Sequence, residues 1–215
     1  MRSKNRKPKF LEAWAASCLV LVMVLPWGAR PLAAAEKAVE PRLVDDFEDG
    51  DLEAPSGLYW IILTDEQFGG TSKARVEVVA GEDARGKSFL RFSGETTEEA
   101  PVVVAAAWVP ISKEGLAEDL NAYSGIRFTA RSVGEQKSFA LGARRGRAQI
   151  GLFDRPFEVG AEWTVIEVPF AEMKQTQPAL APMEWSKEDV SWLGFVTPRG
   201  YLGPFTLEVE RLEIY

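Results

Sequence analysis

The amino-acid sequence predicts an all-β protein with the architecture of an antiparallel sandwich or barrel, and three observations lead to this class. Short runs rich in β-branched and aromatic residues follow one another along most of the chain. Glycine, proline, aspartate and asparagine separate these runs, as they do in the turns between antiparallel strands. No long stretch keeps the 3.6-residue period of an amphipathic helix.

Alternation of apolar and polar residues supports the individual strands. Ile126, Phe128 and Ala130 alternate with polar neighbours, and Phe139 and Leu141 repeat the pattern, so each run should bury one face. The run 101–109 is apolar at nearly every position, which predicts a central strand covered on both sides. The predicted strands are 74–81, 88–95, 100–111, 124–133, 137–146, 148–159, 162–170, 190–196 and 204–215.

The last predicted strand contains an irregularity. Leu207 and Val209 occupy odd positions, whereas Leu212 and Ile214 occupy even positions. The inward phase therefore reverses near Glu210, which predicts a β-bulge. Elsewhere, segments 112–121 and 185–190 are expected to form a turn or two of helix, and 171–184, with its two prolines, a long loop.

The N-terminal 35 residues predict a signal peptide, followed by a short exposed leader at 36–42 and a single domain at 43–215. A basic start precedes an apolar run at 13–25, and Ala33 and Ala35 supply the small residues of a cleavage site. A retained membrane anchor is the alternative, although thirteen residues are fewer than the roughly 20 that span a bilayer. Cys18 is not expected to carry a lipid, because the apolar run continues beyond it. The protein is thus expected to be exported, to the periplasm or the exterior.

Removal of this segment limits the chemistry that the chain can perform. Of 25 basic and 32 acidic residues, 6 and 1 lie before position 36, which leaves 19 and 31 and a net charge of −12. The single cysteine is lost and the chain has no histidine. Cys/His zinc sites, Ser-His-Asp triads and Cys-His nucleophiles are therefore excluded. The acidic balance argues against nucleic acid as a partner, and membrane contact is expected only if the first segment is retained.

An acidic segment, LVDDFEDGD at 43–51, is the first candidate site. Its spacing does not match an EF-hand, because alignment on Gly50 places Phe47 and Ser56 where oxygen ligands are needed. If Phe47 points into the core, Asp46 and Glu48 point to the opposite face. These acids either cap the start of a strand and keep an edge soluble, or bind calcium together with a distant carboxylate.

A second candidate stretch runs from 59 to 76. Gly69 and Gly70 indicate a backbone conformation or close packing that side chains would obstruct. Trp60 and Phe68 beside them are either core aromatics, which we favour, or a binding platform.

Basic and aromatic residues supply the remaining candidates. Arg144, Arg145 and Arg147 form either a solvated arginine face or a contact for an anion or a protein, since the guanidinium group suits carboxylates. Trp185, beside the proline-containing loop, is the tryptophan most expected to be exposed. Paired carboxylates could support glycoside hydrolysis, but the sequence indicates no such pair and we assign no catalytic residue.

Several of these stretches together resemble the complex I intermediate-associated protein 30 family over 43–215. The matching pieces, in order, are DDFED (45–49), Trp60, Asp65, FGG-x-S (68–72), LRFSGE (90–95), LNAYSGIRFTARSVGE (120–135), EWTVIEVPF (162–170), WLGF (192–195) and GPFTLEVERLEIY (203–215). Phe68 stands where the family commonly has Met, and Thr64 where it often has Asn. The resemblance singles out Trp60, Asp65, Gly69, Gly70 and Ser72 as binding residues, to which the basic and aromatic patterns add Arg144, Arg147 and Trp185.

The resemblance also implies a fold and a class of function. The family is similar to galactose-binding-like jelly-roll sandwiches, including carbohydrate-binding modules that begin with DDFEDG and hold a structural calcium. Carried over, this implies calcium ligands at Asp46, Glu48 and Glu210, with Glu210 replacing the more usual Asp. We expect a non-catalytic exported binding module, a protein-binding assembly or scaffolding factor of the cell envelope. The alternative is a module that binds a glycan on its concave face. Eukaryotic members assemble respiratory complex I in mitochondria, a role that the export signal argues against here.

Overall fold

The computed structural model describes residues 39–81, 86–99, 102–146, 152–176 and 182–215. The described strands belong to one compact unit, Ala38–Tyr215. The predicted signal segment, the start of the leader and Arg147 lie outside the described residues. Within the described ranges, no helix is both long and apolar enough to cross a membrane.

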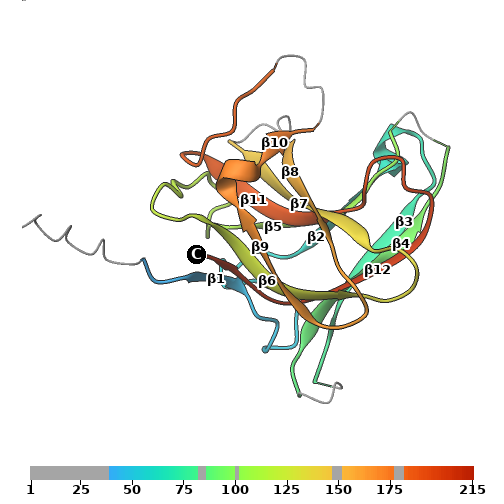
Figure 1. Cartoon of the computed structure of the whole chain (residues 1–215), viewed down its shortest axis with the longest axis horizontal. Coiled ribbons are helices and arrows are strands. Elements are labelled where there is room, and N and C mark those ends of the chain that lie inside the picture. Colours follow the sequence, from blue (N-terminus) through green and yellow to red (C-terminus); the bar gives the residue numbers. More distant parts are fainter. Residues whose placement is uncertain (1–38, 82–85, 100–101, 147–151, 177–181) are drawn as a thin grey trace, which may run out of the picture. The chain divides into compact units, whose positions relative to one another are not determined.

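Two six-stranded antiparallel sheets make up this unit (Figure 1). The first, called here the β12 sheet, has the order β3, β4, β12, β6, β9, with β1 also paired to β12. Its strands are β1 (Arg42–Asp45), β3 (Lys73–Val79), β4 (Phe89–Thr96), β6 (Gly125–Ser132), β9 (Thr164–Pro169) and β12 (Gly203–Ile214). The second, the β7 sheet, has the order β10, β8, β7, β11, β5, β2. Its strands are β2 (Ile61–Thr64), β5 (Ala105–Pro110), β7 (Ser138–Arg145), β8 (Leu152–Glu158), β10 (Lys174–Gln175) and β11 (Val190–Val196).

The predicted all-β jelly-roll sandwich is confirmed, with corrections in its connections. β2 and β10 arise in stretches where the sequence predicted no strand. The expected helical turns at 112–121 and 185–190 are wrong, because both stretches are irregular, with bends, turns and one isolated bridge between Glu118 and Val190. Two 3₁₀ turns form instead, η1 (Asp65–Phe68) and η2 (Phe170–Glu172). Short polar stretches between strands have no apolar face long enough to stabilise a helix against the sandwich.

The hydrophobic core lies between the two sheets. Phe128 of the β12 sheet contacts Phe157 and Phe195 of the β7 sheet, with ring centroids 5.1 Å apart in both pairs. Phe139 and Leu141 are fully buried, as their alternation predicts. Every residue of β5 is buried, so the prediction of a strand covered on both faces is also confirmed.

The first and last strands pair along one margin of the β12 sheet (Figure 1). Arg42 lies opposite Ile214, and Leu43 lies opposite Glu213. On the other side of β12, the register with β6 shifts between Glu210 and Leu212, and Arg211 between them has a φ of 27°. The predicted bulge is therefore present at the predicted place.

Candidate functional site

The three predicted calcium ligands differ in burial and in the groups around them. Asp46 is half-buried and lies 4.0 Å from the guanidinium of Arg211, the bulge residue, whereas Glu48 is exposed. Glu210 is buried on β12. Across the described chain, no three His, Cys, Asp or Glu residues are grouped so that they could hold a metal ion. Calcium binding by these three carboxylates stays a prediction.

Asp45, which the sequence did not single out, is the carboxylate of this segment that enters the interior. Its side chain is 1% exposed and accepts hydrogen bonds from Trp60 Nε1 at 2.8 Å and from the backbone N–H of Phe47 at 2.9 Å. Burial raises the pKa of Asp45 to about 6, because the two neutral donors only partly offset the desolvation of the charged form. Phe47 is fully buried, as predicted. The segment thus anchors the first strand to the core.

The Asp65 and Gly-Gly-x-Ser motif forms a buried structural network. Asp65 accepts hydrogen bonds from the hydroxyl and backbone N–H of Ser72 and from the backbone N–H of Val104. Gly69 ends η1 with a φ of 84°, and the N–H of Gly70 donates to the carbonyl of Asp65. Asp65 and Ser72 are inaccessible to solvent. These contacts hold η1 to β3 and β5, and the binding role expected for the motif stays a prediction.

Two of the three aromatic residues singled out are likewise engaged by the fold. Trp60 is 3% exposed and stacks on Phe195 at a centroid distance of 6.1 Å. Trp185, expected to be exposed, is half-buried and packs against Phe153 and Phe170. Phe68, by contrast, is 58% exposed and is not the core residue that we favoured.

A second hydrophobic cluster covers the outer face of the β7 sheet, which points away from the main core. It contains five buried residues, with three half-buried ones packed against them: Ala106, Trp108, Ala140, Leu152, Val196, Leu63, Val104 and Trp192. We call this surface the tryptophan face. Soluble proteins usually place polar residues on the outer face of a sandwich, so an apolar outer face indicates a specialised surface.

The tryptophan face is organised by one row of residues across four neighbouring strands. Trp108 on β5 lies opposite Gly194 on β11, which lies opposite Gly142 on β7, which lies opposite Asp154 on β8. A Cβ atom on Gly142 would lie 2.5 Å from Cη2 of Trp108, and one on Gly194 2.6 Å from its Cε3. The two glycines therefore make room for the indole to lie across the sheet.

Arg144 covers this indole from the solvent side. Its Cζ lies 4.4 Å from the centre of the Trp108 ring. The guanidinium is half-buried and, within the described part of the chain, neither hydrogen-bonded nor ion-paired. Desolvation without an opposing charge lowers the pKa of Arg144 from its ordinary value. Trp108 Nε1 is also buried without a hydrogen-bond partner among the described atoms.

Asp154 ends the row as a second desolvated charge. It is 8% exposed and accepts a hydrogen bond from the hydroxyl of Thr176. Burial raises the pKa of Asp154, while that hydrogen bond and the charge of Arg199 act in the opposite direction. Arg144 is diagonal to Asp154 across β7 and β8, yet it extends toward Trp108 instead of pairing with this carboxylate.

Of the predicted binding residues, only Arg144 belongs to the tryptophan face. Trp108, Trp192 and Asp154 were missed as a group. A signal was present, because Gly142 and Gly194 interrupt strand patterns, and a glycine inside a strand often marks the close approach of another group. The pairing of the strands was needed to show that both glycines make room for the same indole.

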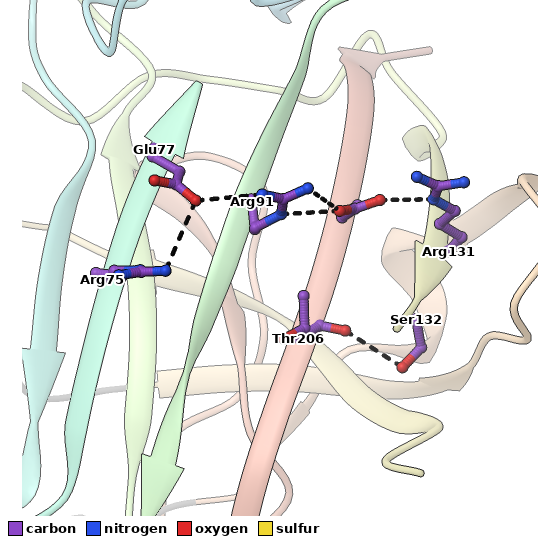
Figure 2. A network of polar contacts seen from close by, with 7 residues as sticks. Arg75, Glu77, Arg91, Arg131, Ser132 and Thr206 are labelled. Atoms are coloured by element: carbon purple, nitrogen blue, oxygen red, sulfur yellow. Dashed lines mark hydrogen bonds and ion pairs between the residues drawn. The ribbon is translucent and has the colours of Figure 1, made fainter. Parts of the chain in front are cut away.

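The outer face of the β12 sheet has a different character (Figure 2). Glu208 is 1% exposed and lies between Arg91, at 2.8 Å, and Arg131, at 2.5 Å. Arg91 also contacts Glu77, and Arg131 lies over the ring of Trp163 at 4.7 Å. This ladder of alternating charges is internally neutralised.

A comparison with family models identifies the chain as a member of the complex I intermediate-associated protein 30 family, matched over residues 46–209. The predicted resemblance is therefore confirmed. No curated protein matches the chain.

Solved structures show the same fold at low sequence identity. The family 11 carbohydrate-binding module of a cellulosomal cellulase of Clostridium thermocellum is 17% identical, with 82% of this chain and 95% of that chain covered and a TM-score of 0.60. A family 30 carbohydrate-binding module is 15% identical, with 80% and 86% covered and a TM-score of 0.58. These structures show that the chain shares the β-sandwich fold of carbohydrate-binding modules.

Proposed function

We propose that this protein is an exported, non-catalytic module that binds another protein through the tryptophan face, as an assembly or scaffolding factor. Family membership supports the choice of a protein partner, because the family is named for its association with an assembly intermediate. The composition of the face supports it as well, since Trp and Arg are the residues most enriched among the energetically dominant contacts of protein interfaces.

The observation that carries the proposal is the position of Arg144 over Trp108 on an apolar outer face. The cluster contains two tryptophans and six aliphatic residues, and the guanidinium of Arg144 that covers it has no acceptor among the described residues. Interface centres show the same bias toward aromatic and Arg side chains and the same depletion of Lys and Glu. On the outer face of the β12 sheet, Arg131 also lies over an indole, that of Trp163, but it is ion-paired with the buried carboxylate of Glu208.

Affinity capture from the envelope fraction of the producing cells tests this proposal. The tagged wild-type protein is expected to retain a stoichiometric partner. Truncating a central Arg or Trp of an interface often reduces affinity by about 2 kcal/mol or more, roughly 30-fold, so Arg144→Ala and Trp192→Ser should each release the partner. Arg75→Ala, on the outer face of the β12 sheet, is the matched control and should retain it. Equal retention by all four proteins would place the binding surface elsewhere.

Glycan binding is the second candidate, favoured by one observation. An indole, a guanidinium and a carboxyl group lie together on the tryptophan face, and sugar hydroxyls can contact all three. A solved neighbour of the same fold is described in complex with a β-1,3-1,4-mixed-linked tetrasaccharide. However, Trp108 is 1% exposed, so its ring is not an open stacking platform. Retardation of the wild type, but not of Arg144→Ala, in gels containing mixed-linked β-glucan would favour this candidate over a protein partner.

Export and calcium binding are the remaining parts of the proposal. Cell fractionation followed by N-terminal sequencing is expected to find the protein outside the cytoplasm, beginning near residue 36. Calcium is expected to raise the melting temperature of the wild type but not of Asp46→Ala. An equal response of both proteins would exclude the predicted ligands.

A further inference from the structure

Resting on the proposed protein-binding function, we infer that the partner docks on the tryptophan face with a carboxylate, from an Asp or Glu side chain or a chain terminus, which pairs with Arg144. The inference combines three features of this face. They are a guanidinium and a buried indole N–H that have no acceptor among the described residues, and a local excess of positive charge.

The first two features are hydrogen-bond donors that have no acceptor among the described residues. Every other arginine side chain that the structure describes on β4, β6, β7 or β8 has a carboxylate within ion-pair distance. Arg144 alone in this set has neither a carboxylate nor a carbonyl partner, and its ring contact with Trp108 leaves its N–H groups unused. Trp108 Nε1 beneath it lacks a partner as well. Trp108 Nε1 is enclosed, as are Ser56 Oγ and Trp185 Nε1, which likewise have no hydrogen-bond partner among the described atoms, so it does not by itself indicate a ligand. The half-buried guanidinium of Arg144 is the donor that a ligand can reach, and a ligand that brings an acceptor complements it.

The third feature makes a charged acceptor fit better than a neutral one. Lys174 on β10 lies opposite Asp154, and Arg199 is close enough to Asp154 to influence its ionisation. Together with Arg144, these residues place three cations against one carboxylate on this part of a protein whose net charge is −7. A partner carboxylate at Arg144 would therefore approach a locally positive surface.

Prior desolvation of Arg144 adds to this complementarity. Forming a buried ion pair normally removes water from both partners, and this loss offsets most of the attraction. Arg144 is already half-buried against the indole in the free protein. Arg144 therefore loses less hydration on pairing with a carboxylate than a fully exposed arginine would. Its planar guanidinium also offers the carboxylate two parallel N–H donors.

Titration of the ¹⁵N-labelled protein with two capped peptides tests the inference. The probes are tetraglutamate and its neutral counterpart tetraglutamine, each acetylated and amidated. The Trp108 indole N–H signal, assigned with Trp108→Phe, and the Arg144 side-chain N–H signal are followed. We expect tetraglutamate to shift both signals and tetraglutamine to leave them in place. Arg144→Lys should weaken the response at least tenfold, and Arg144→Gln should abolish it.

Arg75→Gln provides a matched control on the other sheet and should respond as the wild type does. An equal response to both peptides, or an undiminished response of Arg144→Gln with an unchanged backbone spectrum, would overturn the carboxylate inference. The envelope capture experiment separates this outcome from failure of the proposed function. A partner released by Trp192→Ser but retained by Arg144→Gln would contradict the carboxylate while leaving the protein-binding role intact. Absence of any specific partner, even with wild-type bait, would contradict the protein-binding role itself.

Discussion

The outer faces of the two sheets place arginine in opposite situations. On the β12 sheet, Arg91 and Arg131 hold the buried carboxylate of Glu208 between them. On the β7 sheet, Arg144 lies on an indole and has no acceptor among the described residues. The difference follows from register, because Glu208 faces Arg91 and Arg131 directly across neighbouring strands, whereas the residues that face Arg144 are Trp192 and Leu152.

On one surface the arginines have carboxylate partners within the chain, whereas on the other we propose that a ligand supplies the partner. Cross-strand charge pairs stabilise a sheet only when they lie opposite each other. On the β12 sheet, the row of Glu77, Arg91, Glu208 and Arg131 satisfies this condition. On the β7 sheet no carboxylate lies opposite Arg144, and therefore the two faces should respond differently to mutation.

Glu208→Gln should have the largest effect on stability. Removing one member of a buried ion pair leaves its partners uncompensated, and here two arginines would lose their shared carboxylate. Because both arginines are partly exposed, we expect a loss of about 3 kcal/mol, at the low end for such pairs. Urea unfolding measures this loss. Glu77→Gln at the exposed end of the ladder is the control and should change stability by less than about 0.5 kcal/mol. Similar losses in both variants would contradict a ladder centred on Glu208.

Asp45→Asn tests a second buried carboxylate. Unlike Glu208, Asp45 accepts hydrogen bonds only from neutral donors. The pKa of Asp45 is raised to about 6, so its neutral form favours folding. This contribution is complete below about pH 4 and is lost as the pH rises through 6, by up to about 3 kcal/mol. Urea midpoints measured from pH 4 to pH 8 should therefore fall for the wild type and fall less for Asp45→Asn. Asp154, whose pKa is also raised, supplies a remaining slope of the same sign. Identical slopes in both proteins would show that Asp45 is not strongly desolvated.

Gly142→Ala tests the support of the tryptophan face. The added Cβ would lie 2.5 Å from Trp108, which forces the indole and Arg144 above it to move. Overpacking of this kind should reduce the free energy of unfolding by about 2 kcal/mol and should also weaken partner capture. Gly160→Ala is the control, since nothing lies within 4 Å of its added Cβ and the change should stay within about 0.5 kcal/mol. Unchanged stability of Gly142→Ala would mean that Trp108 does not lie across this glycine.

Arg144→Met should have the smallest effect on stability, within about 0.5 kcal/mol. It removes a contact with an aromatic ring but no ion pair, and Met keeps the apolar cover over Trp108. Arg131→Met, the equivalent change on the β12 sheet, should reduce stability by about 2 kcal/mol because Glu208 would lose one of its cations. Thermal melts of the two variants compare the faces directly. A large loss for Arg144→Met would assign Arg144 to the fold and weaken its role in binding.

Much of the fold was predictable from the sequence, because side-chain alternation is a local property. The buried positions of β6, the doubly covered β5 and the bulge beside Glu210 follow from the pattern of apolar residues along single strands. The prediction that β7 buries one face is wrong, because residues 139–143 are buried on both faces and the second cluster covers the outer one. Family membership was predictable from short motifs. The motif residues Asp65 and Ser72 were identified as important, but their function in the fold was not, because burial depends on segments far away in the chain.

What the sequence alone determined is therefore the direction of each side chain relative to its own strand. What only the tertiary structure decided is which strands are neighbours. β5, β11 and the consecutive strands β7 and β8 are neighbours in the sheet, although β5 and β11 are distant from each other in the chain and β11 lies between β5 and β7. Their pairing brings Trp108, two glycines and Asp154 into one row and leaves Arg144 opposite apolar residues. A side chain's orientation depends on a period of two residues, whereas its neighbours depend on the register of strands paired through non-local hydrogen bonds.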